Sequence, residues 1–303
     1  MASILFYQLL ILFLVMLAGF VVSKAKILTS ELASGMGNIL INLTSPCLTF
    51  MSFQIKLTDE LGSRMVKAAF LSFMLVIIAA IISSIVTIKI NSDRRAVICF
   101  ASTFSNCVFM GFPLINAVFG AEGVIYASVY NIAFTFCVWT YGDFILSGQK
   151  TLNLKMIIQK LILNPPLVAT YLGLIFLFLR LGVPSFLGDS LNLLGGMTGP
   201  ISMLILGENI SRINFKKAFA NLDLYFGIFL KLILIPIVSM IFLKLVPDKE
   251  LSSVLFVIAA MPSAVMTAVL SDKYNREPLF ASELTVLTHV LCIVTVPFLY
   301  RFM

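Results

Sequence analysis

The chain has 303 residues, of which 60% are hydrophobic and 12% are charged, and its mean hydropathy is +1.06. One soluble core could not bury so much apolar surface, so the composition excludes a soluble globular protein and predicts a membrane protein with several spans. Basic loops beside anionic lipid headgroups explain the net charge of +7. We therefore expect the protein to interact with the lipid bilayer and not with nucleic acid.

Ten apolar stretches follow one another along the chain, bounded by Lys and Arg residues or by Pro and Gly turns, and each predicts a membrane-spanning helix. The stretches are centred near Leu14, Leu40, Ile77, Phe104, Phe134, Leu174, Gly199, Pro236, Met261 and Val290. Between the fifth and sixth stretches, residues 152–162 alternate Lys155 and Lys160 with apolar side chains, which predicts a cytoplasmic surface helix that links two halves. The expected fold is therefore an all-α polytopic membrane protein.

Lys and Arg residues are shared unevenly between the two sides of the predicted bundle. One set of alternate loops carries thirteen of them and the other set carries seven. The positive-inside rule places the richer side in the cytoplasm. Both termini are then expected outside, in a multi-pass protein of the plasma membrane.

The two halves of the chain carry matching residues at a nearly constant separation. A shift of 154 residues pairs Gly19 with Gly173, Asn38 with Asn192, Thr44 with Thr198 and Pro46 with Pro200, and a shift of 155 pairs Asp93 with Asp248, Glu122 with Glu277, Cys137 with Cys292 and Thr140 with Thr295. These matches predict that residues 1–150 and 151–303 are two five-helix repeats. Since five spans is an odd number, the second repeat must run through the membrane inverted.

Two of the predicted spans contain helix-breaking residues near their middle, at residues 106–113 of the fourth and 261–263 of the ninth. Each break lies about eleven residues inside its span, or roughly 16 Å at the helical rise, which is near the midplane of a hydrocarbon core about 30 Å thick. Non-helical backbone is tolerated at that depth only where protein or a watered cavity satisfies it. The pair is therefore typical of a binding site between discontinuous helices.

We expect the fourth span to lose helical order between Asn106 and Gly111 and to restart at Pro113, and the ninth span to restart at Pro262 and Ser263. Each restart would point unpaired N–H groups, and the positive end of a half-helix dipole, at the midplane, which favours an anion. The half-helices that end there offer carbonyl oxygens for Na⁺ or a proton-bearing water. The alternative interpretation is that Pro113 and Pro262 only kink packed helices.

Lys231 lies about 10 Å inside the eighth span by helical rise. An ionisable group at that depth is a candidate counter-charge for an anion, although its long stem could instead snorkel to the cytoplasmic headgroups. Asp143, Glu208 and Asp223 lie nearer the predicted cytoplasmic ends, where we expect solvated carboxylates. His289, in the tenth span, is expected to be a packed or hydrogen-bonded histidine more than a proton relay.

No motif indicates catalysis or a resident cofactor. The five cysteines all fall in predicted spans without CxxC spacing, so we expect small hydrophobic side chains with no disulfide and no metal site. The sequence contains no HExxH, P-loop or GxGxxG string, and a single histidine offers little to an intramembrane nucleophile. We therefore expect a protein that is not an enzyme and has no cofactor.

The order of these motifs resembles that of the auxin efflux carrier family, the relatives of plant PIN proteins that include bacterial malate and malonate permeases. The likeness covers essentially the whole chain. It is carried by residues 106–113, similar to the family's N-x-G-F-x-G-x-P stretch, by residues 261–264 with 272–274, and by residues 295–297. Lys231 before Pro236, and Pro200 with Leu206 and Gly207, also look like family positions.

The resemblance implies ten helices in two inverted five-helix repeats, like those of NhaA-type antiporters and bile-acid symporters, with spans 4 and 9 interrupted and crossing at the substrate site. It implies that spans 1, 2, 6 and 7 form a dimerising scaffold, and that spans 3–5 and 8–10 form a transport domain that moves as an elevator. The implied substrate is a small organic acid. Val108, Met266 and His289 depart from the family pattern, so the substrate range does not transfer.

We therefore predict a secondary active transporter of small organic anions, mono- or dicarboxylates such as malate, malonate or auxin-like acids. The predicted substrate site consists of Asn106, Cys107, Gly111, Pro113, Pro262, Ser263 and Lys231. The alternatives are a Na⁺- or H⁺-coupled symporter or antiporter of the bile-acid-symporter type with a different substrate, and a non-transporting membrane receptor. We expect a homodimer, with Na⁺ or H⁺ as the candidate coupling ion.

Overall fold

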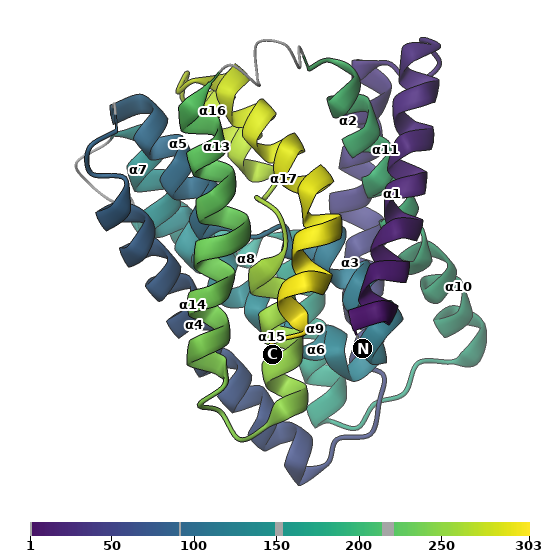
Figure 1. The fold of residues 1–303 in the computed structure, drawn as a ribbon. Coiled ribbons are helices and arrows are strands. Elements are labelled where there is room, and N and C mark those ends of the chain that lie inside the picture. Colours follow the sequence, from purple (N-terminus) through teal and green to yellow (C-terminus); the bar gives the residue numbers. More distant parts are fainter. Residues whose placement is uncertain (1, 91, 149–153, 214–220) are drawn as a thin grey trace.

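The structure is a computed structural model that describes residues 2–90, 92–148, 154–213 and 221–303 (Figure 1). Within these ranges the chain is helical, and its one β-type pairing is an isolated antiparallel bridge between Ser105 and Ser263. The predicted all-α class is therefore confirmed. Figure 1 also shows that the two chain termini lie toward the same end of the bundle.

The helices are numbered in chain order, and η denotes a π-helical turn. The first half contains α1 (Ala2–Lys24), α2 (Ser30–Ile39), η1 (Leu40–Thr44), α3 (Ser45–Ser52), α4 (Asp59–Val86), α5 (Ser92–Thr103), η2 (Cys107–Gly111), α6 (Phe112–Cys137), η3 (Val138–Gly142) and α7 (Asp143–Ser147). The second half contains α8 (Leu154–Ile162), α9 (Pro165–Phe178), α10 (Ser185–Gly196), α11 (Thr198–Ser211), α13 (Leu222–Phe229), η4 (Leu230–Leu234), α14 (Ile235–Leu243), α15 (Lys249–Ala260), α16 (Met266–Lys273) and α17 (Pro278–Tyr300).

Six helical runs are long and apolar enough to cross a membrane, and a seventh is reached if α8 and α9, which meet at 62°, count as one bent span. These runs confirm a multi-pass membrane protein. The expected second, fourth and ninth spans are not among them as separate runs, and breaks follow α5 in the fourth and α15 in the ninth. The run 107–147 bends at Gly120, whose φ of +68° is a conformation that glycine adopts without steric cost.

The predicted linker helix corresponds to α8, while residues 152 and 153 lie outside the described residues. Ile157 is buried and Lys155 is exposed, as expected for an amphipathic helix. The Nζ atom of Lys160 lies 3.4 Å from the ring centroid of Trp139 in η3, which is a cation–π contact that ties the linker to the first half.

Three of the four described π turns end immediately before a helix whose second residue is proline, at Pro46, Pro113 and Pro236. A proline ring clashes with the carbonyl of the residue four positions earlier and provides no N–H to bond it. A wider turn moves that carbonyl away, so the chain stays helical through each of these prolines. Proline in these spans therefore widens the helix without ending it.

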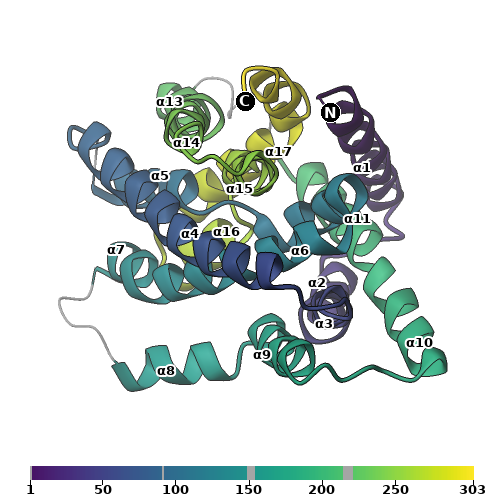
Figure 2. The same ribbon diagram turned by 90° about the horizontal axis from the view of Figure 1, so that it is seen from below.

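The helices pack in two groups (Figure 2). In the first group, α1 packs along α11, and α3 packs against α9 and α10. The second group contains α4–α7 and α13–α17, with α6 packed against both α4 and α15. The groups meet where α1 contacts α17 and α6 contacts α3.

Glycines allow the closest helix contact of the first group, between α1 and α11. A Cβ atom placed on Gly19 would lie 2.6 Å from the carbonyl oxygen of Leu204, and one placed on Gly207 would overlap main-chain atoms of Met16 and Phe20. Lipid tails are as apolar as the helices, so membrane helices associate through such close backbone packing.

We predict that Gly207→Ala lowers the free energy of unfolding by about 1–3 kcal/mol, because the added methyl group forces α1 and α11 apart. Thermal unfolding in detergent measures the effect. Gly35→Ala in α2 is the control, since a Cβ atom there has open space within 4 Å, and helix propensity favours alanine by roughly 0.5–1 kcal/mol. Equal melting temperatures for Gly207→Ala and the unmodified protein would refute the close contact.

Candidate functional site

The two predicted breaks lie in contact with each other. Helix α5 ends at Thr103 and helix α15 ends at Ala260. The N–H of Asn106 donates to the carbonyl oxygen of Pro262 at 2.8 Å, and the N–H of Ala264 donates to that of Phe104 at 2.9 Å. Each break therefore satisfies hydrogen bonds of the other's backbone, which is the condition for irregular chain in a membrane. The paired segments, residues 104–106 and 262–264, are called the crossing below.

Helix α6 begins at Phe112, within one residue of the predicted restart at Pro113, whereas the second restart lies beyond the predicted Pro262 and Ser263. In the first break, Cys107–Gly111 is not disordered but forms the π turn η2: the Asn106 side chain caps it by accepting from the Phe109 N–H at 3.3 Å, and the Gly111 N–H reaches the Asn106 carbonyl at 3.0 Å. In the second break, Met261 is extended at ψ 152° and α16 begins only at Met266. Pairing between the breaks keeps Pro262 and Ser263 out of the helix.

Pro113 lies inside a continuous helical run and interacts with the first group of helices. The missing N–H of Pro113 leaves the carbonyl of Phe109 without a helical donor, and the Ser202 hydroxyl of α11 donates to that carbonyl at 2.6 Å. A Cβ atom on Gly199 would lie 3.2 Å from the Pro113 ring. Pro113 therefore contributes to packing against α11.

Lys231, in η4, is completely buried, and its head group binds the first break. Its Nζ donates to the Ser105 hydroxyl oxygen at 2.7 Å and more weakly to the Ser102 carbonyl at 3.4 Å. The Ser105 hydroxyl in turn donates to the Ala259 carbonyl at 2.9 Å. The side chain does not snorkel, and no ion pair involving Lys231 is present among the described residues.

His289 joins the same site through Asn106. Its Nδ1 lies 2.7 Å from the Thr285 carbonyl oxygen, which can only accept, so Nδ1 carries the proton. The other ring nitrogen, Nε2, then accepts from the Asn106 amide Nδ2 at 2.8 Å. This confirms the expectation of a hydrogen-bonded histidine, and it adds a contact with the break that sequence spacing did not indicate.

Ser263 has an unused hydrogen-bonding group at the crossing. Its N–H donates to the Thr288 hydroxyl oxygen at 3.2 Å, but its own hydroxyl is fully buried and has no partner. The buried hydroxyls of Ser102 and Thr267, which flank the two breaks in sequence, also lack partners. An unsatisfied buried hydroxyl costs about 1–3 kcal/mol, so the crossing retains capacity for a polar ligand.

Cys107 lies at the start of η2, where its thiol is 3.5 Å from the side-chain amide oxygen of Asn131 in α6. All five cysteines are buried and free. The described residues contain no cluster of three or more His, Cys, Asp or Glu side chains able to hold a metal ion.

Of the predicted site residues, four meet at the crossing: Asn106, Pro262, Ser263 and Lys231. The other three, Cys107, Gly111 and Pro113, shape the adjoining turn.

Ion pairs hold the ends of the second helix group. At one end, Arg64 of α4 binds four carboxylates, those of Glu60, Glu122, Asp248 and Glu250, at 2.9–3.3 Å. Three helices, α4, α6 and α15, are thereby fixed to one another.

At the other end, Arg94 of α5 binds Asp223 of α13 at 2.8 Å and Glu277 at 3.6 Å, and Arg276 binds Asp93. Figure 1 shows α4 and α15 beginning at the lower end of the bundle, and α5 and α17 beginning at the upper end. The two sets of ion pairs therefore lie at opposite ends.

Two carboxylates that the sequence places in solvent are instead buried. Asp143 accepts a hydrogen bond of 2.5 Å from the Tyr274 hydroxyl, and Glu208 pairs with Arg212 one helical turn away. Both predictions of a solvated carboxylate were wrong, because a nearby hydrogen-bond donor compensates for the water that the buried carboxylate loses. Burial and the hydrogen bond to Asp143 raise the pKa of Tyr274.

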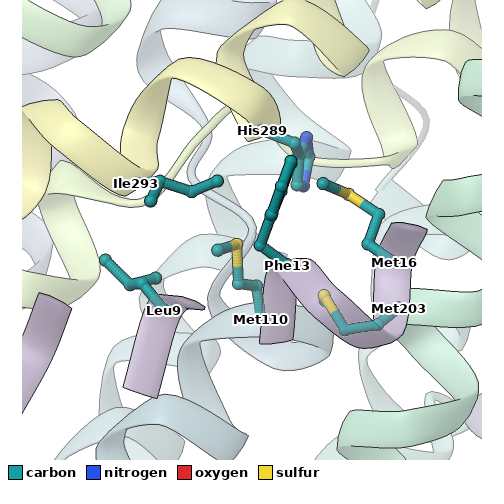
Figure 3. Close-up of a pocket in the computed structure, with 7 residues that line it drawn as sticks. All are labelled: Leu9, Phe13, Met16, Met110, Met203, His289 and Ile293. Atoms are coloured by element: carbon teal, nitrogen blue, oxygen red, sulfur yellow. The ribbon is translucent and has the colours of Figure 1, made fainter. Parts of the chain in front are cut away.

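A narrow crevice adjoins the crossing between the two helix groups (Figure 3). Its walls come from α1, α11, η2 and α17, and it has no room for a water molecule. The side chains that line it are Leu9, Phe13, Met16, Met110, Met203, His289 and Ile293. Figure 3 shows the methionine side chains gathered near Phe13 and His289.

A family model described as membrane transport protein matches residues 4–300 of the chain. The chain belongs to this family of membrane transporters. The predicted membership of the auxin efflux carrier family is thereby confirmed. Two crossing broken helices that enclose a buried lysine are thus found in a protein whose family moves solutes across membranes.

Two curated relatives match along nearly their whole length. An uncharacterized transporter of Methanocaldococcus jannaschii is 26% identical over 294 residues, which cover 92% of this chain and 92% of the relative. An uncharacterized transporter of Methanothermobacter thermautotrophicus is 26% identical over 286 residues, which cover 93% of this chain and 92% of the relative. Both names support transport and specify no substrate.

We predict that Ser105→Ala lowers the free energy of unfolding by about 1–3 kcal/mol, because it leaves the Lys231 ammonium without its closest partner. Lys231→Met alone should be neutral or stabilising, since a buried charge is replaced by an apolar chain. In the double variant, the cost of Ser105→Ala should shrink by about 0.5–3 kcal/mol. Thermal unfolding of all four proteins in detergent measures this coupling.

Ser252→Ala is the control for this double-mutant cycle. Ser252 is buried and donates to the Leu243 carbonyl at 3.3 Å, and Leu243 is about 18 Å from Lys231 along the helix by rise. The effect of Ser252→Ala on the free energy of unfolding should add to that of Lys231→Met. Additive effects of Ser105→Ala and Lys231→Met would show that the two side chains do not depend on each other.

Proposed function

We propose that this protein is a secondary active transporter of small organic anions, mono- or dicarboxylates, and that Lys231 is the counter-charge for the substrate. The observation that carries the proposal is a completely buried lysine without a carboxylate partner in the described residues, bound to the crossing of two broken helices. An uncompensated ammonium in a low-dielectric site costs several kcal/mol. A substrate carboxylate would offset that cost.

Other groups at the crossing suit the same ligand. Helix α16 and the helical run that begins with η2 both start at the breaks, where the positive ends of their dipoles favour negative charge. The unpartnered Ser263 hydroxyl can donate to a carboxylate oxygen. We propose a substrate site bounded by Ser105, Asn106, Ser263 and Lys231, with His289 orienting the Asn106 amide.

We propose that the helices form ten spans in two inverted five-helix repeats, residues 1–150 and 151–303. The sequence-matched carboxylates support this symmetry: Glu122 and Asp248 share one arginine at one end of the bundle, while Asp93 and Glu277 bind arginines at the other end. In an inverted repeat, equivalent residues must exchange ends in this way.

We also propose that the two helix groups move relative to each other. Spans 1, 2, 6 and 7, which contain α1–α3 and α9–α11, would form a scaffold that pairs with a second copy of the chain. The remaining spans would form a transport domain that carries the crossing, held rigid by the ion pairs at its two ends. Sliding of this domain along the scaffold would give elevator-type alternating access in the plasma membrane, with both termini outside and with Na⁺ or H⁺ as coupling ion.

We predict that Lys231→Met retains or raises the melting temperature of the empty protein but abolishes its stabilisation by carboxylates. A ligand at a hundred times its Kd stabilises the native state by about 2.7 kcal/mol. The measurement is thermal unfolding of purified protein across a panel of mono- and dicarboxylates. Lys244→Met, at the exposed end of α14, is the control and should keep the ligand-induced shift.

Uptake of radiolabelled carboxylate into proteoliposomes separates a transporter from a receptor. Saturable uptake that Lys231→Met removes and Lys244→Met preserves is the expected result. Stabilisation by a carboxylate without uptake would point to a receptor. A full carboxylate-induced shift in Lys231→Met would disprove the role of Lys231 as counter-charge.

A further inference from the structure

The linker helix α8 has one face toward the bundle and one face away from it. Ile157 and Lys160, three residues apart, lie on the first face, where Ile157 is buried and Lys160 is partly buried. Ile158 and Ile162 lie on the second face and are 55% and 58% exposed. Figure 2 shows α8 along the edge of the bundle. In a membrane protein, an exposed apolar face of a surface helix lies against lipid.

The ammonium group of Lys160 has no hydrogen-bond partner among the described residues, although its Nζ atom is shielded from water. It lies over the ring of Trp139. The ring face attracts a cation but offers no conventional acceptor, whereas an ammonium group can donate three hydrogen bonds. Burial and the nearby charge of Lys273 lower the pKa of Lys160. An anion at this position would supply the missing acceptor and counter-charge.

The charged groups around Lys160 leave an excess of positive charge. Lys273 and Asp143 are the side chains that act on Lys160 electrostatically. Asp143 is already engaged, because the Tyr274 hydroxyl donates to it at 2.5 Å, and Lys273 Nζ donates to the Tyr274 oxygen at 3.2 Å. Two ammonium groups and one carboxylate carry a net charge of one, which matches the single negative charge of a phosphodiester. Basic pockets beside membrane helices are suited to anionic lipid headgroups.

We propose that Lys160 and Lys273, beside Trp139, bind the phosphate of an anionic phospholipid. Trp139 is partly exposed and Lys273 is exposed, so a headgroup has access to both. The long side chain of Lys160 turns from the ring face toward the phosphate, as lysines at membrane surfaces do. The acyl chains lie along Ile158 and Ile162. The adjoining apolar face favours a lipid over free phosphate.

The position of α8 gives such a lipid a place between the two helix groups. Helix α8 contacts η3 and α6 of the second group and α9 of the first group. The lipid therefore binds where the chain passes from one helix group to the other. The site shares no residue with the crossing, so it is independent of the proposed substrate and of its counter-charge.

The fluorescence of Trp139 tests the lipid site directly, because the chain contains a single tryptophan. The protein is reconstituted into vesicles of phosphatidylglycerol or phosphatidylcholine with dibrominated acyl chains, mixed with the unbrominated lipids, and quenching gives the relative affinity of the two lipids beside Trp139. We expect about a fivefold preference for phosphatidylglycerol, which corresponds to the roughly 1 kcal/mol that a basic residue contributes at an anionic surface. Equal quenching by the two lipids would overturn the inference.

Variants of α8 separate a defined site from a general attraction by positive charge. Lys160→Gln should abolish the preference, whereas Lys160→Arg should keep it, because a guanidinium group also donates to phosphate. Lys155→Gln is the matched control, since it removes the same charge from an exposed position of the same helix, and it should keep the preference. Equal losses in Lys160→Gln and Lys155→Gln would show a diffuse charge effect and contradict the site.

Two further measurements complete the test. Lys273→Gln, at an exposed position outside α8, should reduce the preference without depending on the folding of the linker. Excess inorganic phosphate, compared with chloride at equal ionic strength, should leave the preference for phosphatidylglycerol unchanged. If phosphate removes it and chloride does not, the site binds free phosphate and the assignment to a lipid is wrong.

Discussion

Two main-chain hydrogen bonds, from Asn106 to Pro262 and from Ala264 to Phe104, join the broken helices at the centre of this fold. In a hydrocarbon environment no water satisfies a backbone group that leaves its helix, and each unsatisfied group costs several kcal/mol. Each break is therefore tolerable only because the other is beside it. The pairing fixes where α5 and α15 end and holds their ends near the middle of the fold.

Once the breaks are paired, polar side chains can gather where a continuous helix would exclude them. Ser105 links the Lys231 ammonium to the Ala259 carbonyl, so one hydroxyl joins the eighth, fourth and ninth expected spans. Asn106 caps η2 with its oxygen and binds His289 with its nitrogen. These bonds orient the site but do not neutralise Lys231. We infer that the remaining positive charge is the feature that selects an anion.

The sequence predicted those features that have a local cause. Apolar runs predicted the helices, Pro and Asn located the breaks to within a few residues, and an ionisable group inside a span singled out Lys231. The restart predicted at Pro262 and Ser263 was wrong because pairing with a segment more than 150 residues away decides it. The bond between Asn106 and His289, 183 residues apart, and the methionine crevice have no local signature. Asp143 and Glu208 are buried because their donors, Tyr274 and Arg212, compensate them, which charge position alone did not indicate.

In the proposed transport mechanism, Lys231 receives the substrate's carboxylate. The most direct measurement is an experimental structure of the protein with 4-bromobenzoate, in which anomalous scattering from bromine locates the ligand and its orientation. We expect a carboxylate oxygen within hydrogen-bonding distance of Lys231 Nζ, between the two breaks. A ligand bound with its carboxylate away from Lys231, while Lys231 keeps only its bonds to Ser105 and Ser102, would contradict the claim.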